Sequence, residues 1–311
     1  MLNIIQKRKL YLTISGILVA LSVIGFFTYG LNYGIDFTGG SLMEMEFKTE
    51  RPDNNVIKDA LSGFSLDSLT VQPVGEKGVI LRCKDIDDAK HMAVLQKLDS
   101  LASGASSASS TVETLGNVQE KRFDSIGPSI GKELKTKTLW AVILAIIFIA
   151  LYVAWAFRKV SKRISSWKYG VCAVIALFHD VMIVVGVFVL LGKFYGMGVD
   201  VSFIAALLTI LGYSVNDTIV IFDRIRENLP KRTESFEEIV NISINEALTR
   251  SIHASGTTFV SLIPVYLFGG EAIKCFSLAL LIGLILGTYS SIFIASPILV
   301  EWQLRGKKSN S

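Results

Sequence analysis

Four ionisable side chains occur inside long apolar stretches of this 311-residue sequence: His179, Asp180, Asp217 and His253. Arg250 lies near the end of the stretch that contains His253. A charged side chain at the centre of a membrane helix costs about 2.5 to 3.5 kcal/mol on insertion scales. Residues kept at that cost typically mark ion or proton pathways, so these positions are the first candidates for chemistry.

Asp217 and Arg250 are the leading pair. Asp217 lies about five residues from the end of the stretch 201–222, and Arg250 lies at a comparable depth in the next stretch. A guanidinium opposite the carboxylate would reduce the desolvation cost of both groups, and protonation of Asp217 would then break the pair and change the helix packing. That change is the minimum needed to couple a proton to movement. The alternatives are a structural Asp217, bonded to a neighbouring threonine or to backbone, or an Asp217 that faces a water-filled vestibule. Asn216 and Thr218, beside Asp217, are secondary candidates among the intramembrane polar residues.

The remaining intramembrane polar residues are secondary candidates. His179 and Asp180 lie about ten residues into the third apolar stretch, near the middle of the bilayer. This pair either belongs to an ion pathway or joins helices through hydrogen bonds. His253 shares a helix face with Arg250 through i, i+3 spacing. Asp223 begins a charged segment and is interpreted as an interfacial charge.

Small residues in the last apolar stretch predict a close helix–helix contact. Gly283 and Gly287 are four residues apart and are followed by Thr288, Ser290 and Ser291. Such faces let helix backbones approach closely. The sequence leaves open whether the contact is internal or made with a partner.

Several classes of enzyme lack their motifs. No Gly-x-x-x-x-Gly-Lys-[Ser/Thr] phosphate loop is present, which excludes the common ATPases. No spacing of cysteine and histidine indicates a metal site. The segment 196–200 lacks the contiguous Gly-x-Gly-Asp of intramembrane aspartyl proteases. We therefore predict no enzyme activity, no metal and no cofactor other than a coupling ion, H⁺ or Na⁺.

The elements that must position these residues are membrane helices. With 51% hydrophobic residues and a mean hydropathy of +0.50, the chain reads as a polytopic membrane protein. The predicted organisation is an N-terminus (1–9), a first transmembrane helix (10–31), a domain outside the membrane (32–137), a five-helix region (138–302; helices at about 139–157, 169–191, 201–222, 249–268 and 275–300) with an amphipathic segment (223–248), and a tail (303–311). The first stretch is too long for a signal peptide and no cleavage site follows it, so we expect a retained anchor.

The distribution of lysine and arginine predicts the orientation. The N-terminus, alternate loops and the tail are rich in both residues, whereas the loops between them are poor. Cytoplasmic loops carry this excess. Both termini and the segment 223–248 are therefore expected in the cytoplasm, with the large domain outside. The net charge of +4 is a topology signal and does not indicate nucleic-acid binding.

The domain at 32–137 combines both hydrophobic periods. Strands are expected at 41–48, 68–75, 78–84 and 111–119, and helices at 52–64 and 85–102, with a serine-rich loop at 103–110 between the second helix and the last strand. The order β-α-β-β-α-β predicts a ferredoxin-like α/β domain. His91 is expected on its surface, and Cys83, its only cysteine, cannot form a disulfide within it. After Pro230, a separate amphipathic helix is expected along the inner membrane surface.

Four stretches resemble the SecF subunits of bacterial protein translocases, within the resistance-nodulation-division superfamily. They are GIDFTGG (Gly34–Gly40), GPSIGKEL (Gly127–Leu134), GYSVNDTIVIFDRIREN (Gly212–Asn228) and TRSIHASGTT (Thr249–Thr258). The resemblance covers nearly the whole chain in the same order. The first stretch carries the family motif at the junction of the first helix and the domain: Gly34, Asp36, Gly39 and Gly40.

The resemblance implies an accessory subunit of the Sec translocase in the bacterial inner membrane. Family members pair with SecD, assist the SecYEG channel and indirectly SecA, and use an H⁺ or Na⁺ gradient in late steps of export. The implied contacts also include unfolded preprotein, membrane lipids and a YidC-type insertase. The family's membrane aspartate falls on Asp217 and its arginine on Arg250. The alternative from another class is a scaffold that stabilises SecYEG or insertion factors without moving ions.

Overall fold

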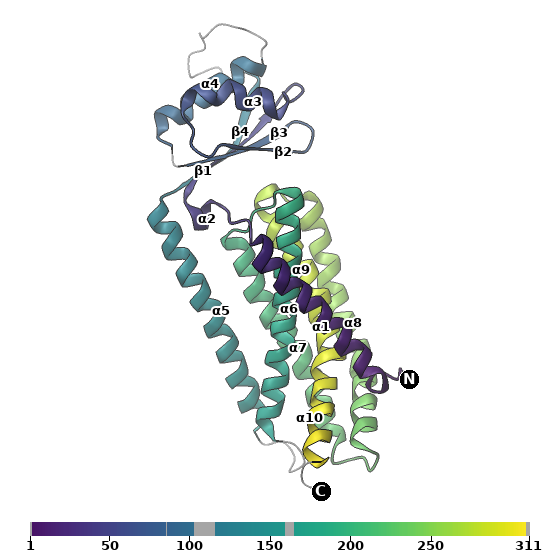
Figure 1. Ribbon diagram of the computed structural model, residues 1–311. Coiled ribbons are helices and arrows are strands. Elements are labelled where there is room, and N and C mark those ends of the chain that lie inside the picture. Colours follow the sequence, from purple (N-terminus) through teal and green to yellow (C-terminus); the bar gives the residue numbers. More distant parts are fainter. Residues whose placement is uncertain (1, 85, 103–115, 159–164, 309–311) are drawn as a thin grey trace. The chain divides into compact units, whose positions relative to one another are not determined.

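The computed structural model describes residues 2–84, 86–102, 116–158 and 165–308. The chain folds into two compact units (Figure 1). Residues 1–32 and 138–311 form a helical unit, called here the transmembrane unit, and residues 33–137 form an α/β unit.

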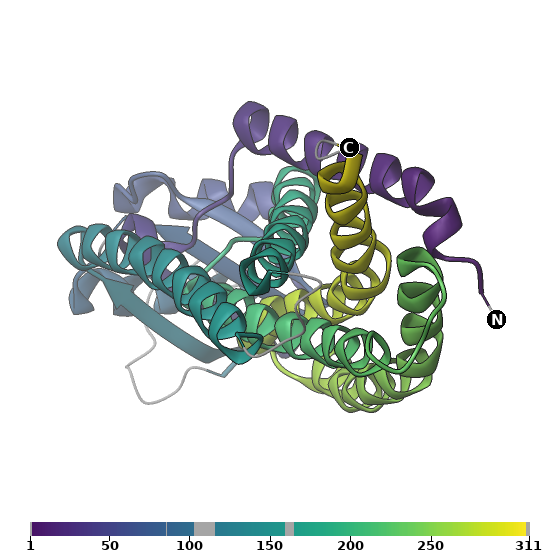
Figure 2. The ribbon, with the colours of Figure 1, turned by 90° about the horizontal axis from the view of Figure 1, so that it is seen from below.

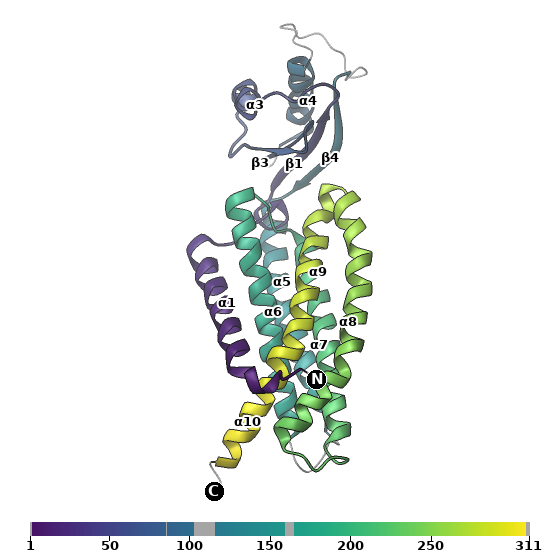
Figure 3. The same cartoon turned by 90° about the vertical axis from the view of Figure 1, so that its right-hand side faces the viewer.

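Six helices in the described residues are long and apolar enough to cross a membrane, as predicted. They are α1 (Arg8–Tyr29, preceded by a 3₁₀ turn at Ile5–Lys7), α5 (Pro128–Ala156), α6 (Ser166–Tyr195), α7 (Val201–Asn228), α8 (Phe236–Phe268) and α9 (Glu271–Ser290), which continues through a π-helical turn (Ser291–Ala295) into α10 (Ser296–Lys308). The start of α1 and the end of α10 lie toward the same end of the transmembrane unit (Figure 3).

Local polar groups set the ends of the central helices. Asp200 caps α7, because its Oδ1 accepts a hydrogen bond from the backbone N–H of Phe203 at 2.9 Å. Ser235 and Glu238 form a reciprocal capping box at the start of α8. Gly196 ends α6 in the left-handed conformation, with φ +68°. These signals explain why the connections fall between the apolar stretches.

The buried centre of the transmembrane unit is formed by α6, α7 and the α9–α10 span. Half or more of the residues in their apolar windows are buried, whereas only 6% of those in α1, α5 and α8 are buried. Figure 2, which looks along the bundle, shows α1 and α5 at its edges. Since the hydrocarbon core of a bilayer is apolar, exposed apolar helices are compatible with lipid contact, and the buried polar residues concentrate in the centre.

The small-residue face of the last span packs against α7. A Cβ atom on Gly283 would lie 2.3 Å from the side chain of Ile210, and one on Gly287 would lie 3.0 Å from the Cβ of Ser214. The predicted close contact is therefore an internal one, and it holds α9 directly against the helix that carries Asp217.

The α/β unit contains one antiparallel sheet in the order β2-β3-β1-β4. Its elements are α2 (Ile35–Thr38), β1 (Gly40–Phe47), α3 (Asn54–Leu61), β2 (Thr70–Val74), β3 (Gly78–Cys83), α4 (Asp88–Ala102) and β4 (Val118–Ile126). After α2, the order from β1 to β4 is the predicted β-α-β-β-α-β. Alternate residues of β1 (Met43, Met45 and Phe47) are buried in one core with side chains of α3 and α4.

Two predicted elements differ from the structure. β4 begins later than predicted and runs on to Ile126, beyond the predicted end of the strand at residue 119. Its pairing with β1 includes a register shift after Glu44, so the inward and outward alternation that marks a strand is broken. Part of the predicted strand (111–115) and the serine-rich loop (103–110) lie outside the described residues.

The prediction of a separate surface helix after Pro230 is also wrong. The segment 236–248 is the first part of α8, which runs without interruption to Phe268. Its charges of both signs suggested a water-exposed helix, but one of its faces is buried against the bundle, at Ile239, Val240 and Ile244. Charge density alone does not distinguish a surface helix from the extension of a membrane helix.

His91 is less exposed than predicted. Its Nε2 lies 2.7 Å from Glu120 Oε1, and its ring stacks on Phe123 with 4.0 Å between the ring centroids. Both partners come from β4, so the contact depends on a strand whose position the sequence did not reveal.

Candidate functional site

Asp217 lies in the buried centre of the transmembrane unit, with 4% of the residue exposed. Asp217 is on α7, four residues after Tyr213, so the side chains of these two residues lie on the same side of the helix. Its Oδ2 atom is buried and has no hydrogen-bond partner among the described residues. An unsatisfied buried carboxyl oxygen is costly, which is the arrangement expected of a group that exchanges a proton or an ion.

Three neighbours act electrostatically on the Asp217 carboxyl group: the hydroxyl groups of Ser251 and Thr288 and the guanidinium of Arg250. The contact with Ser251 falls short of a hydrogen bond, because Ser251 Oγ is buried and also lacks a partner within the described part of the chain. Two buried atoms without a hydrogen-bond partner, Asp217 Oδ2 and Ser251 Oγ, therefore lie near each other at the α7–α8 interface.

The predicted ion pair between Asp217 and Arg250 is not closed in this structure. No nitrogen of Arg250 lies within 4.0 Å of an Asp217 oxygen, and Arg250 is exposed whereas Asp217 is buried. The two residues are coupled only through the longer-range attraction of their charges. Ser251, the next residue on α8, takes the buried position that the sequence assigned to the arginine.

A chain of hydroxyl groups borders the site. Tyr213 Oη donates to Ser255 Oγ at 3.1 Å, and Ser255 Oγ lies 2.5 Å from Thr288 Oγ1. Thr288 also donates to the backbone carbonyl of Leu284 at 3.1 Å. The chain thus joins α7, α8 and α9 beside Asp217.

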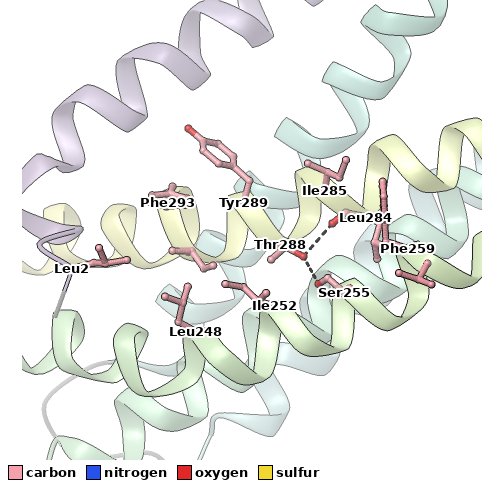
Figure 4. A pocket seen from close by; sticks show the side chains of 13 residues that line it. Leu2, Leu248, Ile252, Ser255, Phe259, Leu284, Ile285, Thr288, Tyr289 and Phe293 are labelled. Carbon is pink, nitrogen blue, oxygen red and sulfur yellow. Dashed lines mark hydrogen bonds between the residues drawn. The ribbon is translucent and has the colours of Figure 1, made fainter. Parts of the chain in front are cut away.

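The same threonine and serine lie at one side of an apolar groove between α8 and α9 (Figure 4). The groove has a volume of about 630 Å³. Its other walls are apolar, with Ile252 and Phe259 from α8 and Tyr289 and Phe293 from the last span. Thr288 therefore contacts both the groove and the Asp217 carboxyl group.

A second polar cluster surrounds Asp180, which is fully buried. Its Oδ2 accepts hydrogen bonds from Ser214 Oγ of α7 at 2.6 Å and from Ser290 Oγ of α9 at 2.7 Å. Its Oδ1 lies 2.9 Å from His179 Nδ1. Asp180 thus joins the three central helices. This arrangement fits the helix-joining interpretation of the pair.

The other predicted polar residues divide into buried and exposed ones. Thr218 is buried; its Oγ1 donates to the carbonyl of Ser214 at 3.1 Å and lies 2.8 Å from Ser291 Oγ in the π-helical turn. Asn216 and His253 are exposed and belong to neither cluster.

The glycine motif at 34–40 lies in the α/β unit, packed on the start of α5. Gly39 has φ +73°, and a Cβ atom there would lie 2.7 Å from Pro128 Cα. Gly40 has φ +127°, and a Cβ atom there would lie 2.5 Å from the carbonyl oxygen of Cys83. Gly34 is buried and Asp36 lies in the single turn of α2. Two stretches singled out in the sequence, 34–40 and 127–134, therefore contact each other.

Apart from Thr218, sequence reasoning did not identify the hydroxyl groups as site residues, and it named Thr288 and Ser290 only as part of a packing face. Ser214, Ser251, Ser255 and Ser290 are common residues without charge, so none stands out by type. A usable signal was their spacing: Ser251 and Ser255 are four residues apart, as are Ser214 and Thr218, which places each pair on one helix face. No group of three or more histidine, cysteine, aspartate or glutamate side chains that could hold a metal ion occurs in the described residues.

Comparisons with known proteins agree on one family. Residues 106–305 match the family model described as protein export membrane protein SecD/SecF, C-terminal, and residues 24–50 match the SecD/SecF GG motif. The protein translocase subunit SecF of Thermobaculum terrenum is 40% identical, over 97% of this chain and 94% of that protein. The protein translocase subunit SecDF of Brucella abortus is 35% identical, over 96% of this chain and 37% of that longer protein.

A solved structure has the same fold. The crystal structure of SecDF from Thermus thermophilus, described as a translocon-associated membrane protein, superposes with a TM-score of 0.82 at 31% sequence identity. The alignment covers 98% of this chain and 39% of the SecDF chain, so this protein corresponds to about two fifths of that molecule.

Proposed function

Because this chain belongs to the SecF family of protein translocase subunits, we propose that it is an accessory subunit of the Sec translocase that couples an H⁺ or Na⁺ gradient to protein export. The coupling group is Asp217. The observation that carries the proposal is the buried Asp217 carboxyl group, whose Oδ2 lacks a hydrogen-bond partner although hydroxyl groups surround it.

The mechanism follows from the two states of the carboxyl group. As a carboxylate, Asp217 attracts the Arg250 guanidinium and can accept hydrogen bonds from Ser251 and Thr288 once these hydroxyl groups move within reach. As a neutral acid it can donate a hydrogen bond but no longer attracts Arg250. Since Ser251 and Arg250 are on α8 and Thr288 is on α9, the exchange changes the forces between three helices. We propose that this change is passed to the α/β unit, which contacts the emerging preprotein.

The partner proposed for this chain is a SecD protein. Support comes from the SecDF relative and the SecDF structure, in which a chain segment similar to this one is part of a longer polypeptide. SecD and this subunit together assist the SecYEG channel, SecA indirectly, and a YidC-type insertase. The protein lies in the bacterial inner membrane with both termini in the cytoplasm and the α/β unit outside. It acts without an enzymatic step or a bound cofactor, and it binds no nucleic acid.

The test compares two aspartates six residues apart on α7. Asp217→Asn removes the buried charge, whereas Asp223→Asn removes a half-exposed charge that pairs with Arg226 at 3.4 Å. In vesicles that contain the translocase, we expect Asp217→Asn to abolish gradient-dependent stimulation of export and Asp223→Asn to retain it. Normal stimulation with Asp217→Asn would refute the coupling role.

A scaffold function is distinguished in the same preparations. If the chain only stabilises its partners, Asp217→Asn lowers the yield of the complex on co-purification. If it couples ions, the yield stays normal and only the gradient dependence is lost. Arg250→Lys provides a further comparison, because it keeps the charge but lacks the planar guanidinium.

A further inference from the structure

His179 is a buried histidine with only one satisfied ring nitrogen. The residue is 4% exposed, and its Nδ1 lies 2.9 Å from Asp180 Oδ1. Its Nε2 is buried and has no hydrogen-bond partner among the described residues. A structural histidine in a helix-joining cluster would be expected to use both nitrogens, so Nε2 requires an explanation.

The contacts of Asp180 suit an ionised carboxylate, and the charge of the pair follows for that form. Two serine hydroxyl groups donate to Oδ2, so both of its contacts use it as an acceptor. Oδ1 then accepts from His179 Nδ1–H, since an ionised carboxylate is an acceptor only. The hydrogen of the neutral imidazole is therefore on Nδ1, and Nε2 carries a bare lone pair. The pair as a whole has a charge of −1.

Helix α1 covers His179. His179 and Gly186 are seven residues apart and so lie on one face of α6. Gly186 packs against Ser22 of α1, where an added Cβ atom would lie 2.3 Å from Ser22 Oγ, and Gly25 lies opposite Val189. The two helices therefore run parallel along this face.

The parallel packing places Ser15, seven residues before Ser22, at the level of His179. Ser15 is buried, and its Oγ lies 3.1 Å from the hydroxyl of Tyr289. The Tyr289 ring in turn stacks on the His179 ring, with 6.2 Å between the ring centroids. Helices α1 and α9 thus close over the imidazole together.

Few titratable groups face the imidazole. Residues 12–28 of α1 contain none, and neither does the π-helical turn. Tyr289 is the titratable group from α9 that contacts the ring. On α7, Asp217 lies one helical turn beyond Ser214, which binds Asp180. Among the described residues, Asp180 is the only charged group paired with His179.

We propose that the His179–Asp180 pair is a second proton-binding site of the transmembrane unit, filled when α1 separates from α6. A proton adds to the Nε2 lone pair, and the pair changes from a buried charge of −1 to a neutral imidazolium–carboxylate pair. In the packing observed here, a protonated Nε2 would be a buried donor without an acceptor, which is unfavourable. Protonation and the movement of α1 are thus coupled. The site deepens the proposed function, and its part in export rests on that function.

Nitrogen-15 NMR of histidine in the full-length chain tests the site directly. The sequence has three histidines, so the variants His91→Gln and His253→Gln assign the His179 signals. We expect the Nδ1–H tautomer of His179 at pH 8 and the doubly protonated ring at pH 5.5. Spin labels at the exposed positions Thr28 and Phe194, in a chain whose cysteines are replaced by alanine, report the distance between α1 and α6. This distance should increase over the same pH range.

Asp180→Asn is the matched variant, because the amide oxygen still accepts hydrogen bonds from the serines but the negative charge is absent. We expect its protonated fraction of His179 at pH 5.5 to be at least tenfold lower and its α1–α6 distance to stay at the pH 8 value. The proposal is overturned if His179 remains neutral at pH 5.5 in the folded wild type. It is also overturned if Asp180→Asn titrates like wild type, or if protonation leaves the distance unchanged. These measurements do not involve export, so failure of the His179 proposal can be distinguished from failure of the coupling role proposed for Asp217.

Discussion

Replacement of Gly39 by alanine should destabilise the α/β unit strongly. Gly39 has φ +73° and ψ +163°, a backbone conformation that is essentially restricted to glycine. Adoption of this conformation by alanine costs about 1 to 3 kcal/mol. The new methyl group would also lie 2.7 Å from the Cα of Pro128, a backbone atom that cannot rotate away. Overpacking of this kind costs about 1 to 3 kcal/mol more.

The two costs add to about 2 to 6 kcal/mol. Since each 1.4 kcal/mol is a factor of ten, the fraction of molecules in which the α/β unit is unfolded, called here the open population, should rise at least about 30-fold. The thiol of Cys83 reports this opening, because the residue is 7% exposed and is the only cysteine of the α/β unit. With Cys172 and Cys275 replaced by alanine, the rate of thiol labelling of Cys83 follows the open population when closing is fast.

Gly63→Ala provides the matched control in the same unit. No atom outside its own neighbours lies within 4 Å of a Cβ at Gly63, and its φ is not in the left-handed region. We expect labelling of Cys83 in Gly63→Ala to remain within a few-fold of the wild-type rate. If Gly39→Ala also labelled at the wild-type rate, the strain and the close contact inferred at the glycine motif would be wrong.

Three further predictions concern other contacts. Gly283→Ala should destabilise the transmembrane unit by about 1 to 3 kcal/mol, because the new Cβ overpacks against Ile210 of α7. Gly212→Ala is the control, since a Cβ there meets no atom within 4 Å, and its melting temperature should change little. Equal melting temperatures of the two variants would contradict the packing. Asn241→Ala removes hydrogen bonds to the backbone of residues 2–5. Trypsin should therefore cleave the N-terminal segment of the variant faster than that of the wild type. An unchanged cleavage rate would show that these hydrogen bonds do not hold the segment in place. Lys121→Gln should raise the pKa of Glu46 toward its ordinary value, because the hydrogen bond and charge of Lys121 lower this pKa in the wild type. The small stabilisation from the pair is present above the ordinary pKa of glutamate and is lost as the pH falls. An NMR titration of Glu46 that is the same in the variant and the wild type would refute the contact.

The membrane helices could be predicted because their signal is long and local. A span needs only about 20 consecutive apolar residues, and five of the six were found from that length alone. The sixth, at about 249–268, is less apolar because it contains a histidine and several serines and threonines. The element order of the α/β unit was also predictable, since the strand at 41–48 alternates and the helix at 52–64 opens with a Pro-Asp start signal. The end of β4 was not, because a register shift interrupts its alternation.

The candidate site could be predicted only where residues carry charge. Asp217 and Asp180 stand out in apolar sequence, and both are buried as expected for such residues. Their serine and threonine neighbours come from helices distant in sequence: Ser290 is 110 residues from Asp180. Only packing brings them together. Arg250 was chosen by charge and depth, but depth does not fix the side of the helix, and Ser251 occupies the buried side instead.

Ion uptake into vesicles tests the central claim most directly. The complete complex of this chain with its SecD partner would be reconstituted, and H⁺ or Na⁺ uptake would be followed under an imposed gradient during preprotein export, with wild type and Asp217→Asn compared at equal complex yield. We expect export by the wild type to be accompanied by uptake of one of the two ions, and we expect Asp217→Asn to abolish this uptake. Equal uptake by both proteins, or wild-type stimulation of export without uptake of either ion, would contradict it.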